Sequence, residues 1–471
     1  MNRQQLYITL RNLFGHVPTE GQEQVMRHLS AFLLSEKSKP VYLLKGYAGT
    51  GKTSIVASLV KTLPLINMRF VLLAPTGRAA KVLTSYSGFQ AHTIHRKIYF
   101  HTRMPDGRRK MVCAENKHTH CVFIVDEASM ITDSATEVGR SLLDDLMQYI
   151  FSGLDCRMLL IGDHAQLPPV GSDFSPALDL QLLRSSYDIT AASFELTEVM
   201  RQALDSGILF NATNVRQKLA ANDPSFPLLN VKPFSDFLKL EPDQVEDLFY
   251  NAFGGKDFSK AVVICRSNKR ANQYNQAIRQ RILGMDFELS SGDLLMIVKN
   301  NYFWTDEQKS GGFIANGDIA EVTRINKFEE LYGFHFADVD ICFIEFPDQP
   351  TMSVKLLTDT LMMDGPALSE SDHLKLSAAV EEDYMYETSR AKRWALIKED
   401  PYFNALQVKY AYALTCHKTQ GGQWPWVFLD SGIYQPEQLD SAYLRWLYTA
   451  ITRATKIIYL MNFLPEFFDE T

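Results

Sequence analysis

The chain has 471 residues, of which 46% are hydrophobic, and a formal net charge of −7. This length predicts about three domains with substantial cores. No apolar run approaches the roughly 20 residues of a membrane span, and neither a secretory core nor a nuclear or mitochondrial import signal is evident. We therefore expect a cytoplasmic protein with no membrane partner. The charge argues against a wholly basic nucleic-acid binder, but it is compatible with a narrow, locally basic groove.

A glycine-rich loop follows the first predicted strand. Residues 41–44 (VYLL) form an apolar run typical of a buried parallel strand, and residues 46–53 (GYAGTGKT) come shortly after it. Such a loop directs successive N–H groups toward a β-phosphate at the start of a helix. Lys52 would reach the β- and γ-phosphates of ATP, and the Thr53 hydroxyl suits a bridging Mg²⁺ ion. The predicted phosphate-binding residues are Gly46, Gly49, Thr50, Gly51, Lys52 and Thr53.

The next segments alternate between strand and helix patterns, apart from one insertion. Residues 70–76 predict a strand and residues 77–83 a helix. The insertion, residues 96–120, contains seven Lys or Arg and two acidic residues. The insertion therefore carries a formal charge of +5. A Pro-Asp-Gly sequence at 105–107 predicts a hairpin turn between its two arms.

An acidic pair follows the next predicted strand. Residues 121–125 are apolar and end in Asp126 and Glu127. Asp126 suits the shell of a Mg²⁺ ion, and Glu127 is placed to polarise the water that attacks the γ-phosphate. Together with the glycine-rich loop, this pair predicts ATP hydrolysis.

Another strand is predicted at residues 157–163, with Gln166 shortly after it as a candidate sensor of the γ-phosphate. Taken alone, this glutamine could equally cap the turn before two prolines. Alternating strands and helices predict an α/β fold with parallel sheets, in which ligands gather at the carboxyl ends of strands. We therefore expect the strand-end side chains to converge at one edge, namely Thr53, Thr76, Asp126 and Gln166.

The strand pattern restarts in the second half of the chain. Apolar strands are predicted at residues 261–265, 427–429 and 457–461, and no second phosphate loop accompanies them. Two such domains would hold ATP in the cleft between them, with cations supplied by the second domain. Arg201 and Arg453 are the candidates, although an isolated arginine is usually an ordinary surface residue.

A second insertion occupies residues 287–404. Residues 293–322 have the short strands and turn signals of a small barrel, whereas residues 369–398 are charged and helix-like. Acidic residues outnumber basic ones over 355–404, which makes this part a poor phosphate surface. It could be a strut toward the basic hairpin or a simple solvated helical hairpin.

Eight motifs resemble, in order, those of superfamily 1 helicases of the RecD-like, phage Dda-like and Pif1-like class, which moves 5′ to 3′. They occupy residues 46–53, 74–80, 91–95, 125–129, 162–170, 200–202, 413–421 and 448–454. The resemblance implies two RecA-like motor domains and a DNA-stimulated ATPase that translocates on single-stranded DNA and unwinds forked or tailed duplexes, with a monomer being sufficient. The alternatives are a DNA- or RNA-stimulated NTPase that acts as a remodeller, and a subunit of a recombination complex.

The resemblance also implies roles for individual residues. Gln22 would read the adenine edge, and Arg201 and Arg453 would clamp the γ-phosphate. Single-stranded DNA would lie in a groove with little base specificity, because the side chains predicted to line it suit phosphate contacts. These residues are Pro75, Thr76, His92, Thr93, Thr415 and His417. Each of them could equally be a turn or cap residue.

The basic hairpin corresponds in this family to a pin that splits the duplex, where Phe100 or Met104 would stack on the last base pair. A solvated basic loop is the alternative. The implied domains are 1–95 with 121–198 for the first motor, 96–120 for the pin and 199–286 with 405–471 for the second motor. Residues 287–404 would form an SH3-like β-barrel insertion with a helical extension.

Overall fold

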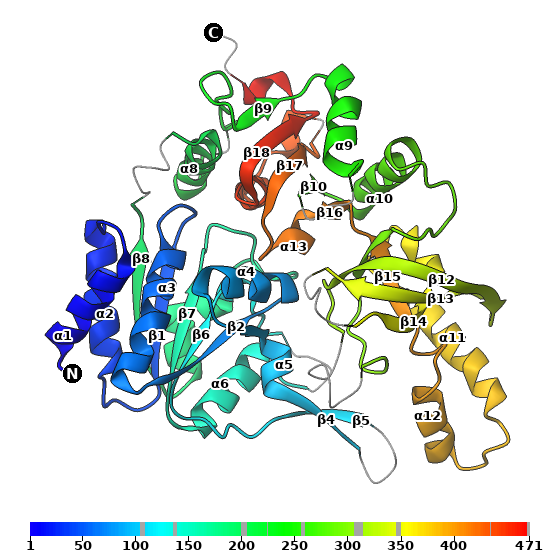
Figure 1. The fold of residues 1–471 in the computed structure, drawn as a ribbon, viewed down its shortest axis with the longest axis horizontal. Coiled ribbons are helices and arrows are strands. Elements are labelled where there is room, and N and C mark those ends of the chain that lie inside the picture. Colours follow the sequence, from blue (N-terminus) through cyan, green and yellow to red (C-terminus); the bar gives the residue numbers. More distant parts are fainter. Residues whose placement is uncertain are drawn as a thin grey trace.

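The computed structural model describes residues 1–103, 109–134, 139–198, 205–223, 225–255, 260–305, 314–344, 350–433 and 435–468. Over these ranges the chain forms two parallel sheets, a closed barrel and a two-stranded hairpin (Figure 1). The predicted α/β fold with parallel sheets is confirmed. None of the helices in the described ranges has the length and apolar character needed to cross a membrane.

The first sheet contains the predicted phosphate loop and acidic pair. Its strands are β1 (Pro40–Gly46), β2 (Arg69–Ala74), β3 (Ala91–Thr93), β6 (Thr119–Val125), β7 (Leu154–Gly162) and β8 (Thr190–Leu196). They all pair in parallel, in the order β3-β2-β6-β7-β1-β8. The carboxyl ends of these strands therefore lie along one edge.

Helices cover both faces of this sheet, because successive side chains of each strand are apolar and point to opposite faces. Leu72 belongs to one hydrophobic cluster and its neighbour Leu73 to the other. One face packs against α1 (Arg3–Phe14), α2 (Glu20–Leu33), α3 (Lys52–Thr62) and α4 (Gly77–Ser87). The opposite face packs against α5 (Ile94–Ile98), α6 (Leu142–Ser152) and α7 (Leu180–Ser186).

The second sheet is also parallel, and it confirms the strands predicted at 261–265, 427–429 and 457–461. It consists of β9 (Phe237–Lys239), β10 (Ala261–Cys265), β16 (Ala413–Thr415), β17 (Trp424–Asp430) and β18 (Ala454–Met461). The strand order is β16-β10-β17-β18-β9. The associated helices are α8 (Gly207–Ala220), α9 (Val245–Phe253), α10 (Asn268–Ala277), α13 (Cys416–Thr419) and α14 (Ser441–Ile451).

A closed five-stranded barrel lies beside the second sheet (Figure 1). Its strands are β11 (Leu294–Ile297), β12 (Ile319–Leu331), β13 (Phe334–Phe343), β14 (Met352–Leu357) and β15 (Leu406–Tyr410). The barrel closes because β15 pairs with both β11 and β14. This last strand lies beyond residue 404, the predicted end of the insertion. The barrel shares one hydrophobic core with the second sheet.

Two smaller elements project from this framework. Helices α11 (Glu370–Asp383) and α12 (Arg390–Lys398) pack on the barrel through a separate cluster and extend away from both sheets in Figure 1. Strands β4 (Tyr99–Arg103) and β5 (Arg109–Cys113) form an antiparallel hairpin beyond the first sheet. Met104 and the predicted turn of that hairpin, residues 105–107, lie outside the described residues.

A buried ion pair joins the barrel to the second sheet. Arg279 lies in a π-helical turn after α10, is 2% exposed, and donates to both carboxylate oxygens of Asp293 at 2.7 and 2.9 Å. Asp293 immediately precedes β11 and is fully buried. The pair therefore fixes the start of the barrel against the helix that leaves the second sheet.

Replacing Asp293 with asparagine is expected to lower the free energy of unfolding by about 3–5 kcal/mol, because it leaves the Arg279 charge buried without its counter-ion. Urea denaturation measures this loss. The control Lys375→Ala removes an exposed pair with Asp372 on α11 and should change stability by less than about 1 kcal/mol. Comparable losses in the two variants would contradict the importance of the buried pair.

Candidate active site

The glycine-rich loop connects β1 to α3 and has the geometry of a phosphate cradle. Gly49 and Gly51 have φ values of 76° and 83°, which glycine adopts without steric cost. A β-carbon on Gly46 would lie only 2.9 Å from Thr50 Oγ1, so a larger residue would disturb the loop. No side chain caps α3, which begins at Lys52. Its first N–H groups are therefore available to an anion.

Lys52 lies over this loop. Its Nζ donates to the carbonyl oxygens of Gly46 and Tyr47, at 2.9 Å for Tyr47. Thr53 follows in the first turn of α3 and is partly exposed. An ammonium and a hydroxyl thus lie beside the uncapped helix start, which is the arrangement expected for binding a polyphosphate.

Gln22 is fully buried at the start of α2 and is hydrogen-bonded to the protein. Its Oε1 accepts from the Thr19 N–H at 3.0 Å, completing a capping box, and its Nε2 donates to the Thr50 carbonyl at 3.0 Å. The side chain therefore links α2 to the phosphate loop. The amide retains a second hydrogen and a second lone pair, and its contact with adenine stays a prediction.

The two acidic residues directly follow β6. Asp126 Oδ1 accepts from the Glu127 N–H at 2.9 Å, and Asp126 Oδ2 accepts from the Tyr86 hydroxyl at 2.6 Å. Burial, reinforced by the nearby carboxylates, raises the pKa of Tyr86, so this hydroxyl is protonated and donates. Two hydrogen bonds thus orient the Asp126 carboxylate, and each oxygen keeps a lone pair for another ligand.

Glu127 has a strained backbone and a perturbed carboxyl group. Its φ of 51° lies in the left-handed region, which non-glycine residues rarely adopt outside constrained sites. Burial raises the pKa of the Glu127 carboxyl, and the positive charge of Arg453 is the strongest opposing influence. The Arg453 guanidinium therefore acts electrostatically on Glu127, although the two residues belong to different sheets. A raised pKa suits a carboxylate that must accept a proton.

Arg453 is 3% exposed and is held between α14 and β18. Its guanidinium donates to the carbonyl oxygens of Thr449 at 3.0 Å and Gly422 at 3.3 Å, and to the Thr452 hydroxyl at 3.2 Å. These three bonds fix the plane of the group. Arg201, the other predicted arginine, lies outside the described residues.

Tyr448 on α14 joins the second sheet to the phosphate loop. Its hydroxyl accepts from the Ala48 N–H at 2.9 Å and donates to Asp163 Oδ2 at 2.6 Å. Ala48 belongs to the loop, and Asp163 follows β7 directly. One phenol therefore connects the loop, the end of a central strand and the opposite sheet.

The segment after β7 has further contacts with the second sheet. The Leu167 N–H donates to Thr449 Oγ1 at 2.8 Å, and Gln420 Nε2 donates to the Leu167 carbonyl at 2.7 Å. Arg445 Nη1 donates to the His164 carbonyl at 2.6 Å. Residues 163–167 are thus held by side chains from α14 and from the loop after α13, so a shift of either body would move this segment.

Two tyrosines of this region are absent from the predicted site. Tyr448 belongs to the same motif as Arg453, and its position in that motif was the available signal. Tyr86 lies near the end of α4, and no local sequence pattern distinguishes it from a tyrosine that packs on a core. Its contact with Asp126 depends on the packing of α4 on β2 and β3, since β2 pairs with β6.

Four predicted nucleic-acid contacts lie at or next to the carboxyl ends of strands. Thr76 and Thr93 each cap a helix by accepting from the backbone N–H three residues onward, at 3.2 Å in both cases. Pro75 follows β2 and Thr415 ends β16, and both are partly buried. Thr76 and Thr93 are therefore helix-capping residues. Whether any of these four residues contacts DNA stays a prediction.

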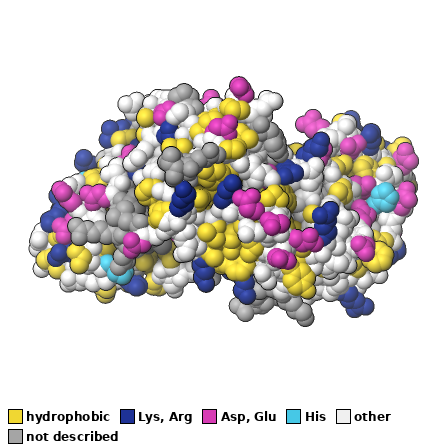
Figure 2. Space-filling model, turned by 90° about the horizontal axis from the view of Figure 1, so that it is seen from above, with side chains coloured by type: hydrophobic (Ala, Val, Ile, Leu, Met, Phe, Trp, Pro, Cys, Tyr) yellow, Lys and Arg dark blue, Asp and Glu magenta, His cyan; other side chains and the backbone are white. Residues whose placement is uncertain are grey.

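The other three candidates are exposed. His92 and His417 lie on the surface next to these caps, and Phe100 on β4 is 48% exposed. Figure 2 shows Lys and Arg intermingled with Asp and Glu over the face that it displays, rather than one continuous basic field.

The ends of the two sheets approach each other at α4. A β-carbon on Gly421 would lie 2.6 Å from Ala79 Cβ and 3.1 Å from Thr76 Oγ1, and Gly421 has a φ of 72°. The Arg78 guanidinium stacks on Trp424 at 4.1 Å from the ring centroid. The first turn of α4 is therefore in direct contact with the loop between α13 and β17.

The residues present fit a magnesium nucleotide. Gln166 is 6% exposed, and its Oε1 has no hydrogen-bond partner in the part of the chain that the structure describes. The same is true of Ser129 Oγ, two residues after Glu127. Among the described residues no cluster of three His, Cys, Asp or Glu side chains forms a metal cage. Mg²⁺ often takes only one or two protein ligands and completes its shell with phosphates and water.

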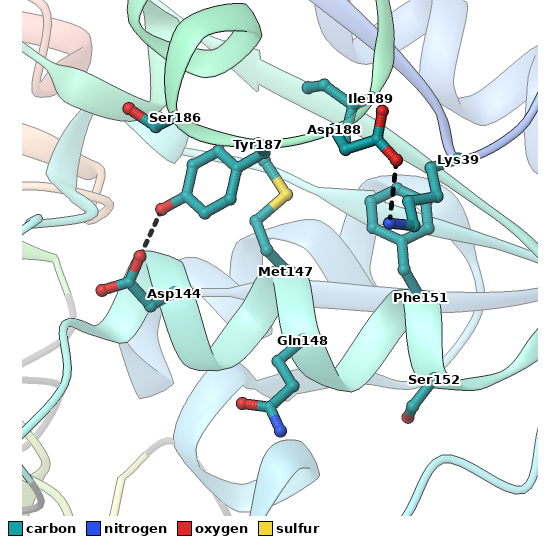
Figure 3. Close-up of a pocket in the computed structure, with 10 residues that line it drawn as sticks. All are labelled: Lys39, Asp144, Met147, Gln148, Phe151, Ser152, Ser186, Tyr187, Asp188 and Ile189. Atoms are coloured by element: carbon teal, nitrogen blue, oxygen red, sulfur yellow. Dashed lines mark hydrogen bonds and ion pairs between the residues drawn. The ribbon is translucent and has the colours of Figure 1, made fainter.

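A pocket of about 490 Å³ lies between α6 and the segment before β8. Figure 3 shows Tyr187 directed at Asp144 and Lys39 at Asp188, and these pairs lie 2.6 and 3.6 Å apart. Lys39 and Ile189 immediately precede β1 and β8. The pocket therefore lies at the amino ends of the strands, at the edge of the sheet opposite the phosphate loop.

Two family profiles match the chain. Residues 18–223 match the family described as AAA domain, and residues 410–461 match the UvrD-like helicase C-terminal domain. The first match includes the phosphate loop and acidic pair, and the second includes Tyr448 and Arg453.

Curated relatives are similar over parts of their length. The chain is 29% identical over 199 residues to the ATP-dependent RecD2 DNA helicase of Deinococcus radiodurans, covering 41% of this chain and 24% of that protein. It is 28% identical over 287 residues to the ATP-dependent DNA helicase dda of Enterobacteria phage T4, covering 59% and 60%. The chain thus spans less than two thirds of each of these relatives.

A solved structure of the Pif1 helicase from Bacteroides with ADP-AlF3 and ssDNA aligns with 96% of this chain and 94% of that chain, at 15% identity and a TM-score of 0.47.

Proposed function

We propose that this chain is a superfamily 1 helicase of the RecD, Dda and Pif1 type, and that it uses ATP hydrolysis to move 5′ to 3′ on single-stranded DNA and to unwind the duplex ahead of it. One observation carries the proposal. Tyr448, on the helix that ends two residues before Arg453, contacts the phosphate loop at Ala48 and the end of β7 at Asp163. A nucleotide held in this seam between the two sheets would touch both bodies. The 5′-to-3′ direction follows from the family.

The proposed roles in hydrolysis follow from position and chemistry. The loop N–H groups and Lys52 bind the phosphates, Glu127 accepts a proton from the attacking water, and Gln166 contacts the γ-phosphate. Arg453 stabilises the negative charge that develops on that phosphate, and its rigid guanidinium suits this role. Arg201 is the proposed second arginine. Thr53 and Asp126 would hold Mg²⁺, which neutralises charge on the phosphates when bound.

Loss of the γ-phosphate would change the contact between the two sheets. While the phosphate is present, it attracts the cationic side chains of the second body. After hydrolysis this attraction weakens, and the contacts of residues 163–167 with α14 offer a path for the change to reach this helix, which ends two residues before Arg453. Alternating closure and opening of the seam is the proposed translocation step, and a monomer suffices for it.

The proposed domains are two RecA-like motors, a pin and an SH3-like barrel with a helical extension. Residues 1–95 and 121–198 form the first motor, and residues 199–286 and 405–471 form the second. The strand β15 belongs to the barrel by pairing, although it follows residue 404. The pin is the hairpin of β4 and β5 within residues 96–120. The DNA track follows Pro75, Thr76, His92, Thr93, Thr415 and His417.

Two measurements test this function. ATP hydrolysis should rise on addition of single-stranded DNA, and unwinding should require a fork or duplex with a 5′ tail. Unwinding from a 3′ tail alone would refute the direction. DNA-stimulated hydrolysis without unwinding of either substrate would indicate a remodeller instead, and stimulation by RNA alone would indicate an RNA substrate.

Replacing Phe100 with alanine is expected to slow unwinding about 5-fold or more, because the exposed ring would no longer stack on the last base pair. Hydrolysis stimulated by single-stranded DNA should persist. Stopped-flow unwinding and steady-state ATPase assays measure the two effects. The matched control is Phe328→Ala, which truncates a 54%-exposed phenylalanine on β12 of the barrel. If Phe100→Ala impairs both activities equally, the hairpin belongs to the general DNA grip.

A further inference from the structure

A hydrogen bond connects α4 to the predicted magnesium ligand. The Tyr86 hydroxyl donates to Asp126 Oδ2 at 2.6 Å, and the Glu127 N–H holds the other oxygen at 2.9 Å. Tyr86 packs with its ring against the hydrophobic cluster on this face of the sheet. Because the phenol supplies one of two bonds that orient the carboxylate, a displacement of Tyr86 changes where Asp126 points.

The opposite end of the same helix lies at the proposed DNA track. Thr76 caps α4, and the first turn contacts Gly421 and Trp424 of the second sheet. Tyr86 lies nine residues after Gly77, about 14 Å along the axis at the usual helical rise. A short helix is stiff over that distance, so a change at its first turn is transmitted to its last.

The barrel also contacts this helix start. A β-carbon on Gly77 would lie 2.6 Å from Asp318 Oδ1 in the turn before β12, and Lys81 Nζ donates to the Ile344 carbonyl at 2.9 Å. The position of α4 thus depends on three bodies at once: the first sheet, the second sheet and the barrel. A strand of DNA bound between them would bias that position.

We propose that Tyr86 is a positioning residue that couples occupancy of the DNA track to the orientation of Asp126. This inference rests on the proposed function, and it names the contact through which bound DNA favours magnesium–nucleotide binding. Hydrogen-bond partners of metal ligands fix ligand orientation, and their loss typically lowers metal affinity by about 10–100-fold. By linkage, DNA and the magnesium nucleotide then strengthen the binding of each other by the same factor.

The test is Tyr86→Phe, which removes the hydroxyl and retains the ring in the hydrophobic cluster. The readout is equilibrium binding of a fluorescent, non-hydrolysable ATP analogue, titrated with Mg²⁺ in the presence and absence of a thymidine oligonucleotide. In the wild-type protein the oligonucleotide should tighten binding about 5-fold or more. In Tyr86→Phe the tightening should fall below about 2-fold, and half-saturation should require about 10-fold more Mg²⁺.

A matched control exists on the other face of the first sheet. The Tyr187 hydroxyl donates to Asp144 Oδ1, also at 2.6 Å, and its ring packs against the hydrophobic cluster opposite Tyr86. Tyr187→Phe removes an equivalent bond and should keep the wild-type effect of DNA. Oligonucleotide affinity without nucleotide should be the same in both variants and in the wild-type protein, because a purely structural loss in α4 would weaken it.

Three results would overturn the inference: a full DNA effect in Tyr86→Phe, an equal loss of that effect in Tyr187→Phe, or weakened DNA binding by Tyr86→Phe without nucleotide. Each of these leaves the proposed helicase function standing if the wild-type protein shows DNA-stimulated hydrolysis and unwinding. If the oligonucleotide changes neither hydrolysis nor analogue binding in the wild-type protein, both proposals fail.

Discussion

Replacing Glu127 with glutamine is expected to slow ATP hydrolysis by about 10²–10⁴-fold while ATP binding persists. The amide keeps the size of the side chain but cannot accept the proton of the attacking water. Burial raises the pKa of the native carboxyl, which matches it to proton acceptance. Single-turnover hydrolysis and equilibrium binding of a fluorescent ATP analogue separate the two effects.

The control for this substitution is Glu330→Gln, which makes the same chemical change at an exposed position on β12. It should hydrolyse ATP at the wild-type rate. Undiminished hydrolysis by Glu127→Gln would mean that another group orients the water, whereas loss of binding would mean that Glu127 supports the loop. The positive φ at Glu127 argues for a functional constraint, since an unconstrained glutamate would relax to an ordinary conformation.

Replacing Arg453 with alanine is expected to lower the rate of hydrolysis by about 10³–10⁵-fold, the usual effect of losing an arginine that stabilises the transferring phosphoryl group. The substitution also leaves the Thr449 and Gly422 carbonyls without this donor. The Thr449 carbonyl keeps the Thr452 hydroxyl as a donor at 2.9 Å. A buried carbonyl that loses its donor costs about 1–3 kcal/mol, so some loss of stability accompanies the loss of activity.

Arg453→Lys separates these two effects, because lysine keeps the charge but lacks the planar set of donors. We expect Arg453→Lys to hydrolyse ATP nearly as slowly as Arg453→Ala. Its melting temperature should lie closer to that of the wild-type protein. Arg324→Ala, at an exposed position on β12, is the control for loss of a cation and should leave the rate unchanged. A wild-type rate in Arg453→Lys would show that charge alone suffices, and a wild-type rate in Arg453→Ala would exclude the residue from the reaction.

The contacts of α14 give these two predictions a common structural basis. This helix carries Tyr448 and Thr449, which bond to the phosphate loop and to the segment after β7, and it ends two residues before Arg453. A movement that displaces Arg453 would therefore also disturb those contacts. Under the proposed function, catalysis and the relative position of the two sheets would be linked through this one helix.

Local patterns in the sequence were sufficient to predict the phosphate loop and the acidic pair of the first sheet. The phosphate loop, its flanking strand and the strand ending in Asp126 and Glu127 are each contiguous, and alternation of apolar runs with helical segments indicated parallel sheets. Such features depend on neighbours within about ten residues, so the local sequence pattern predicts their backbone conformation and burial. The small barrel was predicted for the same reason, from short strands separated by turn signals.

Local patterns did not predict which strand closes the barrel. The strand β15 has the buried, apolar-rich character of the central strands that surround it in the sequence, and only its pairing with β11 and β14 assigns it to the barrel. The sheet that a strand joins is decided by its pairing with strands distant in the sequence, and the sequence of one segment does not specify that pairing.

The seam likewise arises from tertiary packing. Ala48 and Tyr448 are 400 residues apart, and Asp163 and Tyr448 are 285 apart, yet each pair shares a hydrogen bond. Tyr86 reaches Asp126 because α4 packs on β2, the neighbour of β6. Nothing adjacent to this tyrosine in the chain distinguishes it from a core residue. The chain order alone therefore identified the candidate groups for the proposed chemistry. Their mutual orientation was decided by how two separately folded sheets and a barrel pack against one another, since hydrogen bonds of about 3 Å are realised only when all three bodies are in place.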